Sequence, residues 1–89
     1  MRIERDLTIY TVAELKPVVL AAIAASEHGQ LDLSQVTEID SAGLQLLLLA
    51  RREAQHAGHK LCLICNAPAV TEVLKLVGLS AMLAATEAA

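Results

Sequence analysis

The stretch from Ile39 to Leu49 constrains the fold most strongly, because a polar pair and a glycine separate an extended-looking segment from a strongly aliphatic one. Asp40 and Ser41 carry short side-chain oxygens that can accept from the free N–H groups of a first helical turn. Gly43 lets another part of the backbone pack close. The pattern predicts a strand, a tight loop and a helix that begins at Ser41 with its hydroxyl exposed. Free N–H groups and the helix dipole make such a hydroxyl well placed to carry a phosphate.

Length and composition limit the rest of the chain. With 89 residues, the sequence predicts a single domain over residues 1–89, near the lower limit for a self-sufficient core. It is 55% apolar but has one Tyr and no Phe or Trp, so the core must be built from Leu, Ile, Val and Ala. That composition suits helices packed on a small sheet.

Charge and hydropathy exclude several classes of protein. The net charge of −3 argues against nucleic acid as a partner, because nucleic-acid binding needs a concentrated basic surface. The longest apolar run, Val18 to Ala25, is far shorter than the roughly 20 residues of a membrane span, so we expect no direct membrane insertion. The first residues lack the apolar core of a signal peptide. Together with only two cysteines, this predicts a cytoplasmic protein.

The first part of the chain predicts a strand followed by a helix. Ile3, Leu7 and Ile9 indicate one short strand or the remnant of a hairpin. The run from Thr11 to Glu14 has the pattern of a capping box, with a hydroxyl at the N-cap and a carboxylate three residues later. We expect that helix to run to about Ser26 and to be ended by His28 and Gly29, with Pro17 disturbing its first turn.

The remaining elements follow from short patterns and their stop signals. The sequence predicts strands at Gln30–Ser34 and Lys60–Cys65, with Val36–Asp40 leading into the central loop. It predicts a second helix from Ser41 to Ala57 stopped by Gly58, and a third that begins at Pro68 and is closed by Gly78. Residues 80–89 fit a short strand, a helical turn or a frayed tail. Strands that alternate with helices imply parallel pairing, hence an α/β fold.

The faces of the second helix follow from its 100° rotation per residue. One face should lie on the sheet and comprises Gly43, Leu46, Leu47, Ala50, Ala54 and Ala57. The opposite face comprises Ser41, Leu44, Gln45, Leu48, Arg51, Arg52 and Gln55. Leu44 and Leu48 on this polar face are either incidental exposed leucines or anchors of a docking surface beside the arginine pair.

Three features together resemble the STAS family, which is named after sulphate transporters and anti-sigma-factor antagonists. They are the run Asp40-Ser41-Ala42-Gly43-Leu44 after an extended segment, the first helix with its capping signal, and Val77-Gly78-Leu79 after the third helix. The resemblance covers nearly the whole chain. It implies a small STAS-type α/β domain with a central mixed sheet of about four strands and helices packed mainly on one side. The chain departs from the family pattern in three ways: the N-terminal segment is short, a glycine near the end of the second strand is absent where Arg5-Asp6 stands, and the C-terminal helix of many members is missing or minimal.

The resemblance also implies a function. In the antagonist branch, the serine after the Asp is phosphorylated by a partner that is both anti-sigma factor and serine kinase, and phosphorylation releases that partner. By position, Ser41 would be the phosphorylation site, in a partner surface of Asp40, Ser41, Leu44, Gln45, Leu48, Arg51 and Arg52. Relatives also serve as small subunits of lipid-transport ATPase complexes or accompany chemotaxis proteins, so these alternatives stay open. We expect a monomer or weak dimer that needs no cofactor.

Other reactive side chains have simpler interpretations. Cys62 and Cys65 have the spacing of half a zinc or redox site, but side chains three apart in a strand point to opposite faces, so buried structural thiols are favoured. His28, His56 and His59 are scattered and expected to face solvent. Asp32, Glu38 and Asp40 form an acidic group near the strand ends that a small-ligand binder or an enzyme could use. No nucleophile–base pair is recognisable, so we expect no enzyme and no metal site.

Overall fold

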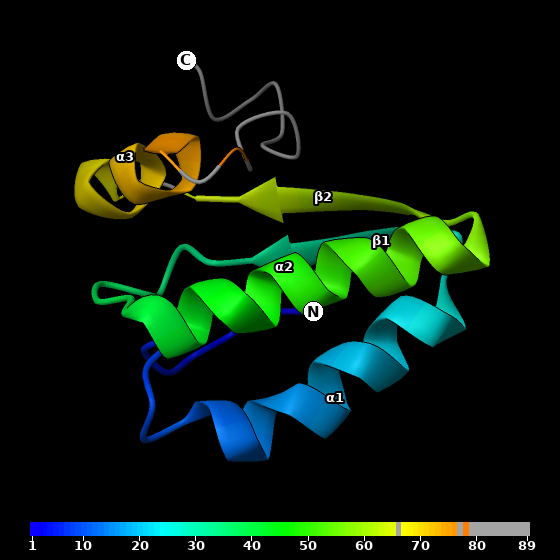
Figure 1. Ribbon diagram of the computed structural model, residues 1–89, viewed down its shortest axis with the longest axis horizontal. Coiled ribbons are helices and arrows are strands. Elements are labelled where there is room, and N and C mark those ends of the chain that lie inside the picture. The colour runs from blue at the N-terminus through cyan, green and yellow to red at the C-terminus, as the bar shows by residue number, and fades with distance from the viewer. Residues whose placement is uncertain (66, 77, 79–89) are drawn as a thin grey trace.

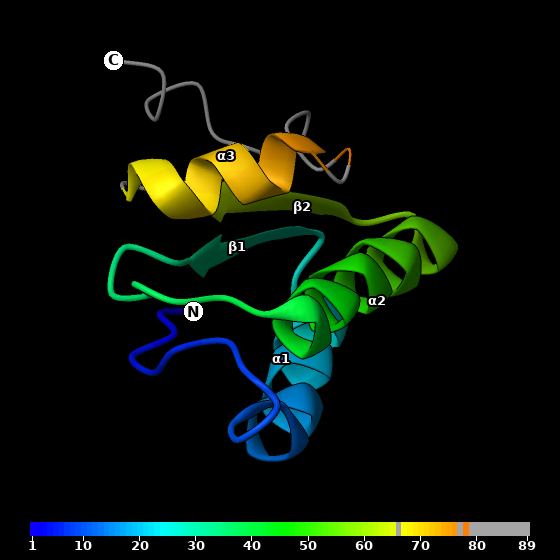
Figure 2. The ribbon, with the colours of Figure 1, turned by 60° about the vertical axis from the view of Figure 1, so that its left-hand side comes forward.

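The computed structural model describes residues 1–65, 67–76 and 78. Its elements follow one another along the chain as shown in Figure 1: α1 (Val12–Ala25), β1 (His28–Asp32), α2 (Ser41–Ala57), β2 (Lys60–Ile64) and α3 (Pro68–Leu76). Helices α1 and α2 run side by side next to the strands, and α3 lies beyond β2, away from α1, in both ribbon views (Figures 1 and 2). This is the small α/β fold that the sequence predicts.

The two strands pair in parallel, with α2 as the connection between them. Their register runs from His28 opposite Lys60 to Asp32 opposite Ile64. Strand β1 begins two residues earlier than predicted, because His28 and Gly29 pair with β2 instead of ending the first helix. Within the described residues the sheet has two strands, so the expected count of about four is not met there.

The N-terminal segment forms two isolated parallel bridges in place of the predicted strand. Arg2 bridges to Asp32 and Leu7 bridges to Ile39. Between the bridges, the Asp6 carboxylate accepts the N–H groups of Thr37 and Glu38 at 2.9 and 3.1 Å. A side chain therefore takes the donors that a continuous strand would bind with its carbonyls.

Helix α2 begins and ends as predicted. Asp40 is its N-cap and accepts the Gly43 N–H at 3.0 Å. Gly58 ends it in the left-handed region at φ 71°, where a residue without Cβ is favoured. Its predicted inner face is buried over five of the six positions, whereas Ala57 is exposed because the last turn extends past the core.

The core is aliphatic and draws on every element. Leu7, Val19, Leu47, Leu63 and Leu74 are fully buried members from the N-terminal segment, the three helices and β2. Burial of each such side chain contributes about 1.5–3 kcal/mol relative to exposure. The N-terminal segment is thus part of the core although it forms no strand.

The capping box predicted at Thr11 is wrong. The Thr11 hydroxyl donates to the Asp6 carbonyl at 2.6 Å and makes no capping bond to α1. Glu14 pairs with Arg5 instead of reaching back to the N-cap. Helix α1 still ends near the predicted residue, at Ala25, and carries Pro17 inside it.

Helix α3 begins at Pro68 as predicted and ends at Leu76. Gly78 has the positive φ of 78° that suits a helix stop. The predictions for Val77 and for residues 80–89 lie outside the described residues.

Candidate functional site

Asp40 ties the beginning of α2 to the N-terminal segment. One carboxylate oxygen accepts the Gly43 N–H at 3.0 Å, and the other accepts the Ile9 N–H at 2.9 Å. The Asp40 backbone N–H donates to the Leu7 carbonyl at 3.0 Å. Two segments that are 31 residues apart in the sequence are thereby held together at one helix end.

Ser41 is the first residue of α2, and its side chain is exposed. Its hydroxyl makes no hydrogen bond to any residue that the structure describes. Because Asp40 caps the helix, the Ser41 hydroxyl is not needed as the cap. The exposed hydroxyl predicted at this helix end is therefore present.

Gly43 allows the close approach that the sequence predicts. A Cβ built on Gly43 would lie 2.1 Å from the Leu7 carbonyl oxygen, closer than any side chain tolerates. The first turn of α2 is therefore pressed directly against the N-terminal backbone. This contact fixes where Ser41 sits relative to Ile9 and Tyr10.

Hydrogen bonds keep the acidic groups beside Ser41 ionised. The backbone N–H of Ile9, followed by that of Gly43, holds the pKa of Asp40 below its ordinary value of 3.8. The backbone N–H groups of Thr37 and Glu38 lower the pKa of Asp6 in the same way. A fixed negative charge therefore lies directly before Ser41.

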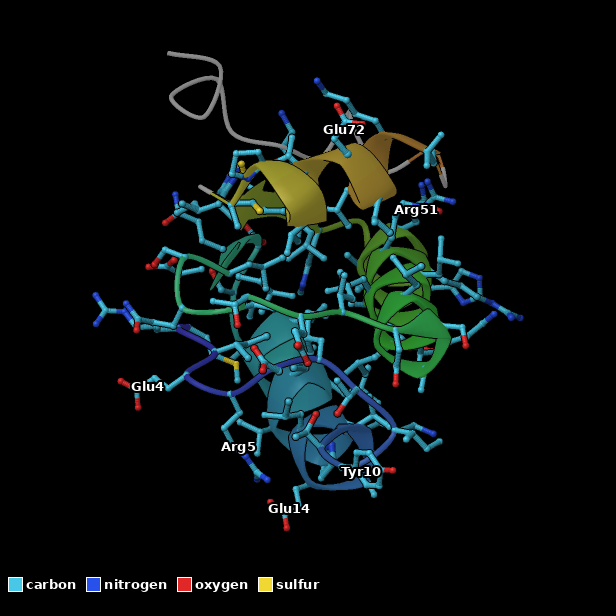
Figure 3. All side chains as sticks on the ribbon, turned by 90° about the vertical axis from the view of Figure 1, so that its left-hand side faces the viewer. Glu4, Arg5, Tyr10, Glu14, Arg51 and Glu72 are labelled. Atoms are coloured by element: carbon cyan, nitrogen blue, oxygen red, sulfur yellow. The ribbon has the colours of Figure 1, made fainter. Side chains whose placement is uncertain are left out.

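The acidic group of the structure differs from the predicted one. Asp6, Glu38 and Asp40 line an open depression of about 720 Å³. Arg5 and Tyr10, which are labelled in Figure 3, line it as well. Asp32 lies elsewhere, where hydrogen bonding from Ser34 and the charge of Arg2 at 3.6 Å lower its pKa. Asp6 was missed because its partners are over thirty residues away in the sequence. No group among the described residues could hold a metal ion.

The remaining predicted contact residues divide between two flanks of α2. Leu44 and Leu48 are half-buried and pack against the core. Arg51 donates to the Gly78 carbonyl at 3.2 Å, on the side of α2 that faces α3 (Figure 3). Gln45 lies on the other flank, next to α1. Arg52 is exposed at the helix surface.

The cysteines and histidines lie away from Ser41. Cys65 is buried and Cys62 half-buried, without a disulfide between them. Thr71 donates its hydroxyl to the Cys65 sulfur at 3.5 Å. His59 is half-buried and lies 3.0 Å from the Ile23 carbonyl, so the prediction that it faces solvent is wrong.

No described helix has the length and apolar character needed to cross a membrane.

Known proteins were compared with this chain by sequence and by structure. No curated protein matches the sequence. Among solved structures, the anti-sigma factor antagonist SpoIIAA in its unphosphorylated form is 23% identical, with a TM-score of 0.78 over 98% of this chain and 80% of that chain. The phosphorylated form of the Bacillus cell fate determinant SpoIIAA is 22% identical, with a TM-score of 0.72 over 98% and 83% of the two chains. These likenesses show a shared fold.

A family model settles the assignment that the fold suggests. The model described as "Mlab, STAS domain" matches residues 1–84. That match spans the N-terminal segment, the Asp40-Ser41 helix start and all three helices. The chain therefore belongs to the STAS domain family.

Proposed function

We propose that this STAS domain is a phosphorylation-gated protein-binding module, with Ser41 as the phosphate acceptor. The observation that carries the proposal is the exposed Ser41 hydroxyl at the first position of a helix that another residue caps. A kinase can reach it without unfolding the helix. The likeness to antagonist structures in phosphorylated and unphosphorylated forms supports the same interpretation.

The fold should tolerate the phosphate. The first turn of a helix has free N–H groups, and its dipole favours an anion at that end. The added charge of about −1.5 to −2 therefore meets a favourable local field. We expect the phosphorylated domain to keep its secondary structure and nearly its thermal stability.

The interface should not tolerate the phosphate. The dianion would stand beside the ionised Asp40 and near the acidic depression, and it would have to lose water when a partner docks. The partner in this proposal is a protein of the anti-sigma factor and serine kinase type. It binds unmodified Ser41 and is released after phosphorylation.

The proposed contact surface is the one expected from the sequence. It comprises Asp40, Ser41, Leu44, Gln45, Leu48, Arg51 and Arg52. Leu44 and Leu48 would contribute the part of their side chains that the core leaves exposed. The domain itself performs no catalysis in this proposal, because it supplies the accepting hydroxyl while the partner supplies the kinase.

A second candidate is a constitutive subunit of a lipid-transport ABC ATPase complex. The observation that favours it is the Asp40 cap, which holds the surface in shape without any covalent change at Ser41. In that role Ser41 would be a contact residue only, and the same surface would bind an ATPase subunit permanently.

Phosphopeptide mapping of the protein from its native cell separates the two candidates. Phosphate on Ser41 that is lost in Ser41→Ala supports the gated module. Persistent absence of phosphate, with a partner that copurifies equally with wild type and Ser41→Asp, supports the constitutive subunit. Ser26→Ala serves as the matched control, because Ser26 is also an exposed serine and lies at the C-terminal end of α1.

A further inference from the structure

A second surface lies on the flank of α2 opposite Leu44 and Leu48. A groove of about 330 Å³ runs between α1 and α2, which lie side by side in Figure 1. Its walls include Val12 and Lys16 from α1, Ala42 and Leu49 from α2, and Ile9 from the connecting segment. Its volume is at the lower end of the roughly 300–1,000 Å³ typical of binding pockets, so it has room for aliphatic side chains.

The groove exposes apolar surface that the core does not use. Ile9, which lines the groove, is 63% exposed. Leu48 packs against the buried core, whereas the next residue, Leu49, lines the groove. These side chains leave a small apolar recess between the two helices that aliphatic side chains of a partner could fill.

Charge identifies the chemistry of the occupant. Lys16 is the single charged residue of the groove lining, and it is exposed. Lys16 forms no ion pair with any described residue, whereas nearby Glu14 is paired with Arg5. The chain has a net charge of −3, so Lys16 is a local positive charge on an otherwise acidic domain. A carboxylate on the bound segment would complement it.

The elements that line the groove also limit the conformation of the segment that can bind there. The groove is lined by α1, α2 and the connecting segment and by no strand, so it offers no sheet edge to which an extended peptide could add. Recognition must therefore come from side chains. An amphipathic helix that places aliphatic residues one turn apart is the segment that fits a groove between two helices.

We propose that the α1–α2 groove binds an amphipathic helix of the partner protein, with aliphatic anchors between Ile9 and Leu49 and an acidic residue against Lys16. This proposal rests on the proposed function and adds the partner segment to it. Ala42 lines the groove and directly follows Ser41. A phosphate on Ser41 would therefore stand close to the acidic residue of the bound helix and repel it.

Selection from a displayed library of helical peptides tests the groove without a known partner. The target is the full unmodified chain, and the probe is the most enriched peptide, measured by fluorescence anisotropy. We expect that peptide to combine two aliphatic residues four apart with an Asp or Glu. Ala13→Trp fills the groove wall and should weaken its binding about tenfold or more, the effect of losing a buried anchor. Ala21→Trp is the matched control, because Ala21 is exposed on α1 outside the groove.

A charge exchange provides the second readout, since Lys16 is exposed and its replacement should not affect folding. Lys16→Glu should weaken the acidic peptide by up to about fivefold, as expected for an exposed ion pair, and a Lys in place of the peptide's acid should restore binding. Failure to enrich any helical peptide, or equal binding to Ala13→Trp, would overturn the proposal. A dimer of the chain that Ala13→Trp dissociates would assign the groove to a second copy and also overturn it. If these variants weaken peptide binding as expected but phosphate on Ser41 leaves the affinity unchanged, the groove stands and only the gating is refuted.

Discussion

The two longer helices each follow a residue with the sequence pattern of an N-cap, Thr11 before α1 and Asp40 before α2. The two side chains form different hydrogen bonds. At α1 the Thr11 hydroxyl is buried and donates to carbonyls of the preceding loop at 2.6 and 3.1 Å. At α2 the Asp40 carboxylate accepts N–H groups from the helix and from Ile9. The Thr11 side chain forms hydrogen bonds within the loop before α1. The Asp40 side chain caps α2 and also binds the Ile9 N–H of the loop before α1.

This difference explains why we place the proposed modification at the beginning of α2 and not at the beginning of α1. The hydroxyl at the beginning of α1 is committed to three hydrogen bonds, to the Thr8 N–H and to two carbonyls. At α2 a carboxylate takes over the capping, so the hydroxyl of Ser41 remains uncommitted. In our proposal, the residue that caps α2 is therefore separate from the residue that is modified.

Gly43→Ala should have the largest effect, because it breaks the contact between α2 and the N-terminal segment. The new Cβ would meet the Leu7 carbonyl at 2.1 Å, so backbone must move. We expect the free energy of unfolding to fall by about 3 kcal/mol or more in urea titration. Gly29→Ala is the control, since its Cβ would have ordinary contacts at 3.7 Å. A wild-type midpoint for Gly43→Ala would show that the close approach does not exist.

Thr11→Val should rank next, because it removes the buried hydroxyl while keeping the shape of the side chain. The Thr8 N–H would lose its acceptor, at a cost of about 1–3 kcal/mol in unfolding free energy. Backbone amide hydrogen exchange should become faster in residues 6–11, and it should change much less within α1. Thr11→Ser keeps the hydroxyl and should stay near wild type. Faster exchange confined to the first turn of α1 would instead identify Thr11 as a helix cap.

Acid should weaken the contacts that the Asp40 and Asp6 carboxylates make between the N-terminal segment and the residues around the beginning of α2. The folded-state pKa values of Asp40 and Asp6 lie below the ordinary 3.8, so their stabilisation is complete above that value and is lost as pH falls through the folded pKa. We expect the melting temperature of wild type to drop below about pH 4, and the drop to be smaller in Asp40→Ala. An unchanged acid slope in Asp40→Ala would contradict the hydrogen bonds assigned to this carboxylate.

Ser41→Ala should have the smallest effect on stability, within about 0.5 kcal/mol of wild type. The side chain is exposed and does not cap α2. A loss near 1 kcal/mol in thermal melting, as for the removal of a true cap, would contradict the separation of the two roles.

Local patterns made α2 and its beginning at Ser41 predictable, whereas contacts between distant residues made other features unpredictable. Gly58, Pro68 and the aliphatic periodicity set helix ends through interactions within a few residues, and those predictions hold. Thr11 was misassigned because its partner, the Asp6 carbonyl, lies in a loop whose path no periodicity reveals. The groove was missed for a similar reason, since it needs α1 and α2 to meet at a particular rotation.

The N-terminal strand shows the same limit at the level of the sheet. Ile3 and Leu7 are buried as the predicted strand requires, but Ile9 of the same pattern is 63% exposed. Only Arg2 and Leu7 form bridges in this segment. Asp6 interrupts the pairing by bonding the backbone of Thr37 and Glu38 with its side chain. The pattern predicted two of the three apolar side chains that would be buried, but not whether the backbone between them pairs.

The central claim is that phosphate on Ser41 acts on binding and not on folding. The direct measurement is the dissociation constant of the kinase-type partner for unmodified protein and for protein fully phosphorylated at Ser41, with thermal melting recorded on the same samples. We predict a loss of affinity of about a hundredfold, near 2.7 kcal/mol, with almost unchanged melting. Equal affinity of the two forms for the partner would contradict the account. So would a loss of affinity in samples whose melting shows that the phosphorylated domain is unfolded.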